Sequence, residues 1–179
     1  MVITNFSQDG AHEKKSAAMS SVIAAVGLTG FKIIVGLSTG SLGILAEAAH
    51  SGLDLMAAVM TFLAVRISGK PADKNHLYGH GKVENLSALF ETLLLLVTCF
   101  WIIYEASHRL LYHTADLEVN YWSFTVMITS IVVDVSRSRI LYRAARKYNS
   151  QALEADALHF STDIWSSGVV ILGLFPVKL

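Results

Sequence analysis

Long apolar stretches separated by short polar segments organise the chain. A helix that spans a membrane needs about 20 consecutive, mostly apolar residues. Five stretches reach that length, over residues 16–37, 42–67, 86–110, 121–141 and 152–175. Apolar and polar residues do not alternate within them, unlike in the strands of a membrane β-barrel. Because a helix satisfies its backbone hydrogen bonds within itself, the pattern predicts an all-α fold, a polytopic membrane helical bundle.

The segments between these stretches are short and polar. Residues 1–15 lack the apolar core and small-residue cleavage site of a signal peptide, so we expect a cytoplasmic tail, followed by a membrane domain over residues 16–179. The sequence STGSLG, between the first two stretches, is typical of a tight turn. We interpret most glycines of these two stretches as positions of close helix packing. They are Gly27, Gly30, Gly36, Gly40 and Gly43.

Composition supports a membrane protein and excludes other classes. Only 16% of the residues are charged, whereas soluble domains carry about a quarter. The formal net charge is zero, so no basic field indicates nucleic-acid binding. The single cysteine, Cys99, cannot form a disulfide within the chain.

The distribution of Lys and Arg predicts the orientation in the membrane. On the side of the N-terminus lie Lys14, Lys15, Arg66, Lys70, Lys74, Lys82, Arg137, Arg139, Arg143, Arg146 and Lys147, and on the opposite side Arg109 and Lys178. Cytoplasmic segments carry the excess of positive charge, so we expect a cytoplasmic N-terminus and a multi-pass protein of the inner or plasma membrane. Five spans would leave the C-terminus outside, and we therefore expect that the chain is a fragment that a sixth span would follow.

Two similar triplets of ionisable residues lie inside the second and fifth stretches. They are Glu47, His50 and Asp54, and Asp156, His159 and Asp163. Positions i, i+3 and i+7 share one helix face, so each triplet forms a polar stripe. The two stretches run in opposite directions and both pairs fall near mid-span. The sequence therefore predicts that two His-x-x-x-Asp pairs face each other at one depth.

Two imidazoles and two carboxylates suit a tetrahedral zinc site. Metal and protons would compete for the same atoms, which gives a physical basis for exchange between them. The alternative is a structural polar cluster in which each His bonds an Asp. Glu47 and Asp156, one turn from the pairs on opposite sides, either line the two vestibules or are hydrated, helix-end carboxylates.

Several other ionisable residues leave alternatives open. Asp73, His76 and His80, in the polar segment after the second stretch, form either a shallow metal site or a solvated loop. We expect Asp134 to pair with an Arg137 that reaches toward the interface, or to line an inner pathway. Glu91 is either buried and functional or paired with Lys32. We assign no role to three further histidines, which are His12, His108 and His113.

The chain resembles the transmembrane domain of the cation diffusion facilitator family, the zinc-transporter superfamily of metal/proton antiporters. The resemblance rests on HSGLD at 50–54, HLYGHGKVE at 76–84, QALEADALHF at 151–160 and HFSTD at 159–163. It implies five of six transmembrane helices, without the cytosolic C-terminal domain, in a protein that works as a homodimer. It further implies a central transport site, a loop site, and a charged element near the dimer interface. Their residues would be His50, Asp54, His159 and Asp163 for the first, Asp73, His76 and His80 for the second, and Lys82 and Glu84 for the third.

The function that we expect is zinc efflux from the cytoplasm in exchange for protons, by alternating access. Zinc is the transported substrate, with cadmium, cobalt or iron as alternatives, and the direction is inherited from the resemblance. Two alternatives are a non-transporting, truncated or structural membrane protein and an intramembrane metalloprotease. The His-Glu-x-x-His helix of the commonest zinc proteases is absent from the sequence, so we do not expect an enzyme.

Overall fold

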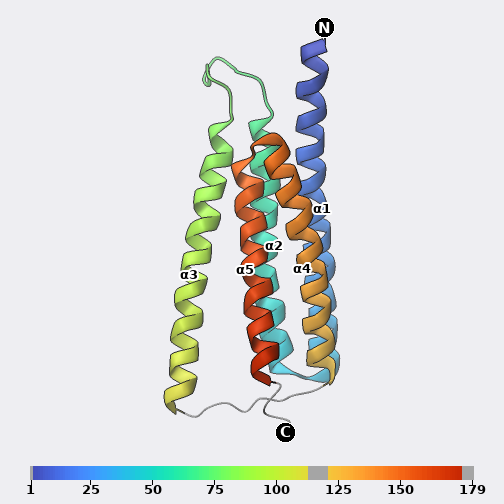
Figure 1. Ribbon diagram of the computed structural model, residues 1–179, viewed down its shortest axis with the longest axis vertical. Coiled ribbons are helices and arrows are strands. Elements are labelled where there is room, and N and C mark those ends of the chain that lie inside the picture. Colours follow the sequence, from blue (N-terminus) through green and yellow to red (C-terminus); the bar gives the residue numbers. More distant parts are fainter. Residues whose placement is uncertain (1, 113–120, 175–179) are drawn as a thin grey trace.

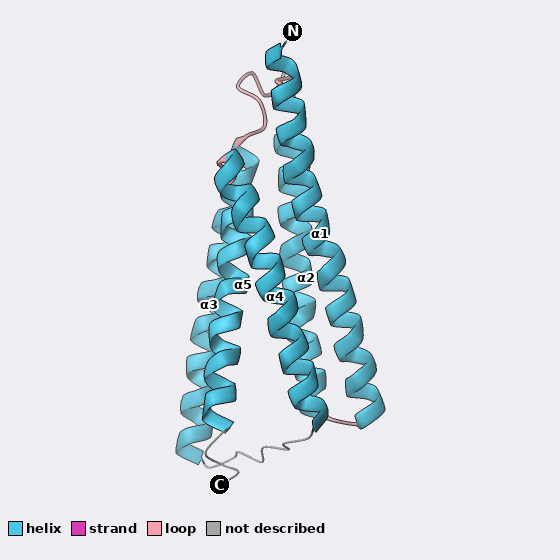
Figure 2. Cartoon of the chain, turned by 45° about the vertical axis from the view of Figure 1, so that its right-hand side comes forward, coloured by secondary structure: helices cyan, strands magenta, loops and turns pink. Residues whose placement is uncertain are grey.

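The described residues form five helices, which lie side by side as a bundle (Figures 1 and 2). The computed structural model describes residues 2–112 and 121–174, and the side chains between Gly10 and Gly168 except residues 105, 106, 109, 110 and 112 to 120. The helices are α1 (Val2–Thr39), α2 (Leu42–Ser68), α3 (Lys82–Tyr112), α4 (Tyr121–Tyr148) and α5 (Gln151–Leu174). Within the described ranges there is no strand, which confirms the predicted helical membrane fold class. His113, Phe175 and Lys178 lie outside the described residues.

Within the part of the chain that the structure describes, three helices are long and apolar enough to cross a membrane. They are Gly10–Thr39 of α1, the whole of α2, and Lys82–Tyr104 of α3. The other two lie beside them in the bundle but carry charged residues along their length, among them Asp134 and Arg137 in α4. That α4 and α5 also cross the membrane stays a prediction.

Two helices extend beyond the predicted apolar stretches. Residues 2–15, which we predicted to form a polar cytoplasmic tail, are helical and continuous with α1, and the division between tail and membrane domain stays a prediction. Long-range ion pairs hold this extension, from Lys14 to Glu84 at 2.7 Å and from Glu13 to Lys147 at 2.7 Å. Similarly, α4 continues to Tyr148, because the arginines and alanines after the apolar stretch still favour a helix.

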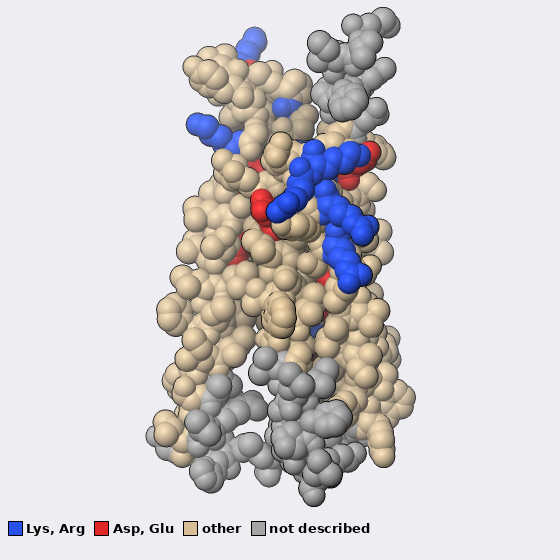
Figure 3. All heavy atoms as spheres, viewed as in Figure 1, with Lys and Arg blue, Asp and Glu red and all other residues tan. Residues whose placement is uncertain are grey.

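The two ends of the bundle differ in what they carry. The N-terminus, the α2–α3 loop and the α4–α5 link lie at one end, which we call the N-side, and the α1–α2 turn lies at the other, the turn side (Figure 1). Lys and Arg side chains gather toward the N-side on the face shown in Figure 3. The turn side is shaped by Gly40 at φ +65° and by Ser41, whose hydroxyl caps α2 by accepting from the N–H of Ile44.

Helix packing needs glycine at fewer positions than we expected. A Cβ at Gly36 would meet the Leu45 side chain at 2.7 Å and its backbone nitrogen at 3.3 Å, so α1 and α2 approach closely there. At Gly27 and Gly30 a Cβ would meet nothing within 4 Å. The packing interpretation therefore holds for Gly36 and was wrong for these two, which face open space.

The best-packed apolar core lies toward the N-side. It joins buried side chains of α1, α2, α4 and α5, which are Ala18, Val65, Leu141, Ala145, Ala152, Leu153, Ala157 and Phe160. Leu141, Leu153 and Phe160 are among the largest side chains that are completely buried. This core closes the interior of the bundle on the N-side.

A buried carboxylate ties together the helix ends above this core. Glu84, in the first turn of α3, is 6% exposed. It accepts hydrogen bonds from Lys14 of α1 at 2.7 Å, from Ser68 of α2 at 2.5 Å and from the hydroxyl of Ser150 in the α4–α5 link. Because a buried charge is tolerated when it is paired and hydrogen-bonded, this network fixes the N-side ends of the helices.

Candidate functional site

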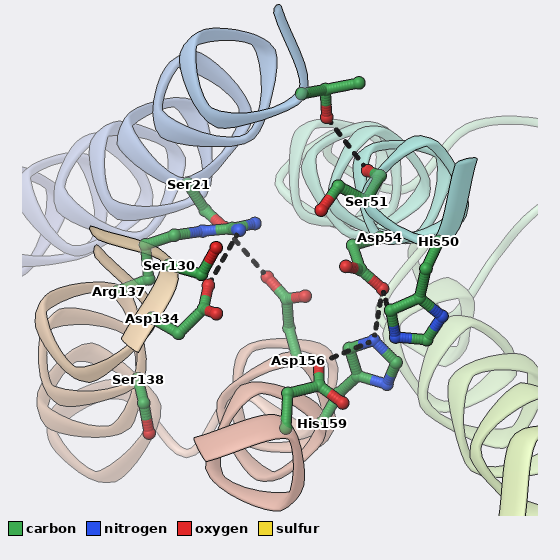
Figure 4. A network of polar contacts seen from close by, with 12 residues as sticks. Ser21, His50, Ser51, Asp54, Ser130, Asp134, Arg137, Ser138, Asp156 and His159 are labelled. Atoms are coloured by element: carbon green, nitrogen blue, oxygen red, sulfur yellow. Dashed lines mark hydrogen bonds and ion pairs between the residues drawn. The ribbon is translucent and has the colours of Figure 1, made fainter. Parts of the chain in front are cut away.

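The two His-x-x-x-Asp pairs lie together in the interior (Figure 4). The Nε2 atom of His159 lies 3.1 Å from Oδ1 of Asp54 and 3.5 Å from Oδ2 of Asp163. His50 completes the group, with Nε2 3.9 Å from the same oxygen of Asp54. The structure thus brings all four residues of the predicted central site into one cluster between α2 and α5.

Helix geometry explains why the four side chains meet. Within each helix the His and Asp are four residues apart, so both project from one face. Because α2 and α5 contact each other in the bundle, the two faces are opposed. The side chains are sheltered to different degrees, with 7% of His159 and 13% of Asp54 exposed, but 37% of His50.

The spacing of the ligand atoms suits a small divalent ion. Around a tetrahedral zinc ion with bonds of about 2.0–2.2 Å, neighbouring ligand atoms lie about 3.3–3.6 Å apart. The distances from His159 to the two carboxylates are close to that spacing. One ligand atom from each of His50, Asp54 and Asp163 also lies within 4.8 Å of the others. In this arrangement His159 contacts the oxygens that an ion would bind, so protonated imidazole and metal exclude each other.

A cavity leads away from the cluster toward the turn side. Its volume is about 300 Å³, and besides three residues of the central cluster it is lined by Lys32, Glu47, Trp101, Ser130, Asp134 and Ser166. On α4 and α5 these residues lie toward the turn side of the buried core that Leu141 and Phe160 help to form. The cluster is therefore reached from the turn side and is closed on the N-side.

The wall of this cavity contains a buried lysine that we did not expect there. Lys32 is 4% exposed, and its Nζ donates to the Ser51 hydroxyl at 2.7 Å and to Glu47 at 3.1 Å. The predicted alternative that Lys32 pairs with Glu91 is wrong, because Glu47 takes that place. The feature of the sequence that could have indicated a buried lysine is its isolated position within an apolar stretch. Glu47 itself is 61% exposed and lies toward the turn side, as its sequence position indicates.

The buried alternative holds for Glu91. Its side chain is 1% exposed and accepts a hydrogen bond from the Thr61 hydroxyl of α2. Its second carboxylate oxygen has no partner among the described residues. Glu91 is thus a carboxyl group inside the bundle, away from the cavity that contains the central cluster.

Asp156 is also fully buried, so its interpretation as a hydrated or helix-end carboxylate was wrong. It accepts from the hydroxyl of Ser21 at 3.4 Å. Ser21 in turn accepts from the guanidinium of Arg137 at 3.0 Å (Figure 4). The acids that precede the two His-x-x-x-Asp pairs therefore have different surroundings, a cavity wall for Glu47 and the closed interior for Asp156.

Arg137 points into the bundle rather than toward the interface. Its side chain is 4% exposed and lies 3.5 Å from Asp134, so the predicted local ion pair exists. Its guanidinium carbon also lies 3.6 Å from the ring centroid of Phe160. The predicted reach toward solvent was wrong, because the Phe160 ring on α5 and oxygen atoms of Ser21 on α1 and Asp134 on α4 hold the guanidinium inside.

The loop residues form a second cluster on the N-side. Nδ1 of His76 lies 3.1 Å from Asp73, and Nε2 of His80 lies 3.4 Å from the other oxygen of Asp73. Ligand atoms of all three lie within 4.8 Å of one another. The carboxylate also accepts hydrogen bonds from the N–H groups of His76 and Asn75. Both bonds lower the pKa of Asp73, and the bond from His76 lowers it more. The three side chains converge, but Asp73 and His76 are half exposed, so the cluster is shallow.

Comparison with known proteins finds similar sequences over most of the chain. The profile of the cation efflux transmembrane domain matches residues 18–179. A cation-efflux pump, FieF of Shewanella oneidensis, is 32% identical over 160 residues, which cover 89% of this chain and 54% of that protein. An uncharacterized transporter of Methanocaldococcus jannaschii is 35% identical over 166 residues, covering 93% of this chain and 58% of its own. The chain spans about half the length of the curated relatives that it matches.

Proposed function

The chain belongs to the cation efflux family, whose transmembrane domain it carries, and on this premise we propose that it is the membrane part of a divalent cation exporter. The transported ion is zinc, which leaves the cytoplasm in exchange for protons. The observation that carries the proposal is the convergence of His50, Asp54, His159 and Asp163 at the end of a cavity. These four residues would bind the ion during transport.

The donor set supports zinc as the preferred ion. Imidazole nitrogens suit zinc, copper, iron and nickel, whereas carboxylates and water alone suit magnesium, calcium and manganese. Two imidazoles and two carboxylates make a formally neutral site with a divalent ion, which reduces the cost of binding it inside a membrane. Cadmium, cobalt and iron are the alternative ions.

The contacts of His159 support exchange for protons. Its ring nitrogen lies against Asp54 and Asp163, so a proton on the imidazole makes two favourable contacts that a metal ion would replace. Loading from the cytoplasm would release protons, and protonation from the other side would release the ion. Each turnover would therefore move protons against the direction of the metal.

Alternating access is supported by the unequal ends of the cavity. The cluster is open toward the turn side and closed by the apolar core on the N-side. With the N-terminus in the cytoplasm, this conformation would be the outward-facing one. The inward-facing conformation would need the core around Leu153 and Phe160 to separate. The loop residues Asp73, His76 and His80 would bind a second ion at the cytoplasmic surface, and the working protein would be a homodimer.

Transport into liposomes tests this function. The purified protein, reconstituted into vesicles with a pH gradient, should accumulate zinc and should dissipate the gradient as it does so. His50→Ala and Asp163→Ala should abolish the flux without unfolding the protein. His12→Ala provides the matched control, because His12 is exposed on α1 far from the cluster, and it should transport normally.

Three outcomes would contradict parts of the proposal. Zinc flux that survives both His50→Ala and Asp163→Ala would remove the central site. Flux without any movement of protons would leave an exporter that is not an antiporter. No flux of any divalent ion by the wild-type protein would favour a structural membrane protein, and cleavage of a membrane substrate would favour the metalloprotease alternative.

A further inference from the structure

One face of α4 is strongly basic near the N-side. Arg139, Arg143, Arg146 and Lys147 are all exposed, and their spacing of four, seven and eight residues places them on one face of the helix. Figure 3 shows Lys and Arg side chains gathered on this face of the molecule, over α4 in the view of Figure 1. The excess of positive charge on this face is local, although the chain as a whole has no formal net charge.

Among the described residues, the cations of this face are only partly neutralised. Lys147 is paired with Glu13 at 2.7 Å, and Arg146 lies 5.0 Å from the ring of Tyr142. Among the residues that the structure describes, neither Arg139 nor Arg143 has an ionic partner. Two guanidinium groups are therefore available to bind an anion.

A groove between α1 and α4 lies beside one of these arginines, Arg143. Its volume is about 360 Å³, and it is lined by Glu13, Ser16, Ala17 and Ser20 on α1 and by Ile140, Arg143, Ala144 and Lys147 on α4, with Glu13 paired to Lys147. The small side chains on α1 leave the space, and the serine hydroxyls and Arg143 give it polar walls. Of the four cations on the face, Arg143 and Lys147 line the groove, whereas Arg139 and Arg146 do not.

Exposed apolar side chains lie on the same two helices, nearer the turn side than the groove. On α1 they include Ile23 and Val26, which are 66% and 54% exposed, and on α4 they include Val132, which is 64% exposed. Such side chains belong in the hydrocarbon of a membrane, whereas the basic end of the groove belongs at the level of the head groups. The surface therefore offers polar and cationic groups at one depth and apolar contact nearer the turn side.

We propose that the α1–α4 groove binds one anionic phospholipid from the leaflet on the N-side. Its phosphate would lie against Arg143, with the Ser16 hydroxyl as a hydrogen-bond donor, and an acyl chain would follow Ile23 and Val132. Charge complementarity and the order of polar and apolar contacts select a phospholipid over a protein partner. This binding is independent of transport and of the metal site.

Binding of defined lipids to the purified, delipidated protein tests the proposal. Native mass spectrometry should detect one retained phosphatidylglycerol molecule and markedly less phosphatidylcholine at the same concentration. Arg143→Gln should weaken phosphatidylglycerol binding about fivefold, the effect of one cation near a head group. Ser20→Leu, which fills the groove without removing charge, should weaken it at least as much.

Arg146→Gln is the matched control. It removes one positive charge from the same face of α4 but outside the groove, so it should change binding less than twofold. Equal losses for Arg143→Gln and Arg146→Gln would mean diffuse attraction to a basic surface and would overturn the proposal. Full retention by Ser20→Leu would do the same, as would equal binding of phosphatidylcholine. Displacement of the lipid by millimolar inorganic phosphate would indicate a site for free anions instead.

Discussion

The guanidinium carbon of Arg137 lies 3.6 Å from the ring centroid of Phe160, inside the bundle and above the candidate metal site. The same guanidinium donates to Ser21 of α1 at 3.0 Å and lies 3.5 Å from Asp134 of α4. Because Phe160 belongs to α5, one side chain connects three helices. A buried cation is tolerated only when such partners compensate its charge. The stability of the fold therefore depends on these contacts.

Replacing Arg137 should therefore destabilise the protein strongly. Arg137→Met keeps much of the side-chain volume but leaves Asp134 without its cation, and breaking a buried ion pair costs about 3–5 kcal/mol. Arg137→Lys should cost less, because it keeps the charge but loses the planar stack on Phe160. Thermal unfolding in detergent measures both. Arg139→Met is the control on the exposed face, and equal melting temperatures for it and Arg137→Met would contradict the expectation.

Zinc should stabilise the protein through the central cluster. An ion at about 100 times its Kd adds about 2.7 kcal/mol to the free energy of unfolding. We expect His159→Ala to lose most of the zinc-dependent rise in melting temperature, since His159 contacts both carboxylates. The rise that remains should disappear when Asp73→Ala is added. An undiminished rise in His159→Ala would show that zinc binds elsewhere.

The order of the α2–α3 loop should depend on pH through Asp73. The N–H of His76 donates to this carboxylate at 2.7 Å and lowers the pKa of Asp73 below its ordinary value. A lowered pKa in the folded state means that the ionised group favours the folded loop. Its contribution is therefore complete above the ordinary pKa of about 3.9 and is lost as the pH falls through the lower, folded-state pKa.

NMR shifts of the amide protons of Asn75 and His76 measure this transition. In the wild type both should move together in acid as their acceptor is protonated. In Asp73→Asn the amide oxygen can still accept these bonds, so the turn should persist and the titration step should vanish. A step of the same size in Asp73→Asn would assign it to another group.

Glycine substitutions in α1 should have opposite effects at two positions. Gly36→Ala places a Cβ against Leu45 at the close approach of α1 and α2, and overpacking of this kind costs about 1–3 kcal/mol. Gly27→Ala meets open space and should stabilise the helix by up to about 1 kcal/mol. The melting temperatures of the two variants measure these effects. If Gly27→Ala lowered the melting temperature as much as Gly36→Ala, this face of α1 would be covered.

The helical fold and the meeting of the two pairs could be predicted because both depend on local rules. In lipid, apolar length alone identifies a helix, and α2 ends within one residue of its predicted limits. A spacing of four residues puts His50 and Asp54 on one face whatever surrounds them. Antiparallel packing then brings that face to His159.

The surroundings of single charges could not be predicted, since they depend on distant partners. The sequence places Arg137 near a membrane interface, where it can point either way. Its inward direction depends on Ser21, 116 residues earlier in the chain, and on Phe160 of the next helix. Similarly, the helical extension of α1 depends on Glu84, a partner that no local pattern around Lys14 reveals.

The network around Glu84 also has a consequence for biogenesis. Its partners Lys14 and Ser150 lie 70 residues before it and 66 residues after it. When α3 leaves the ribosome, the lysine is already made, but the serine is not. The carboxylate can therefore be fully satisfied only after α4 has been synthesised and the chain has turned into α5. Membrane insertion of the first three helices would give an incomplete intermediate, and the N-side ends of the bundle would assemble last.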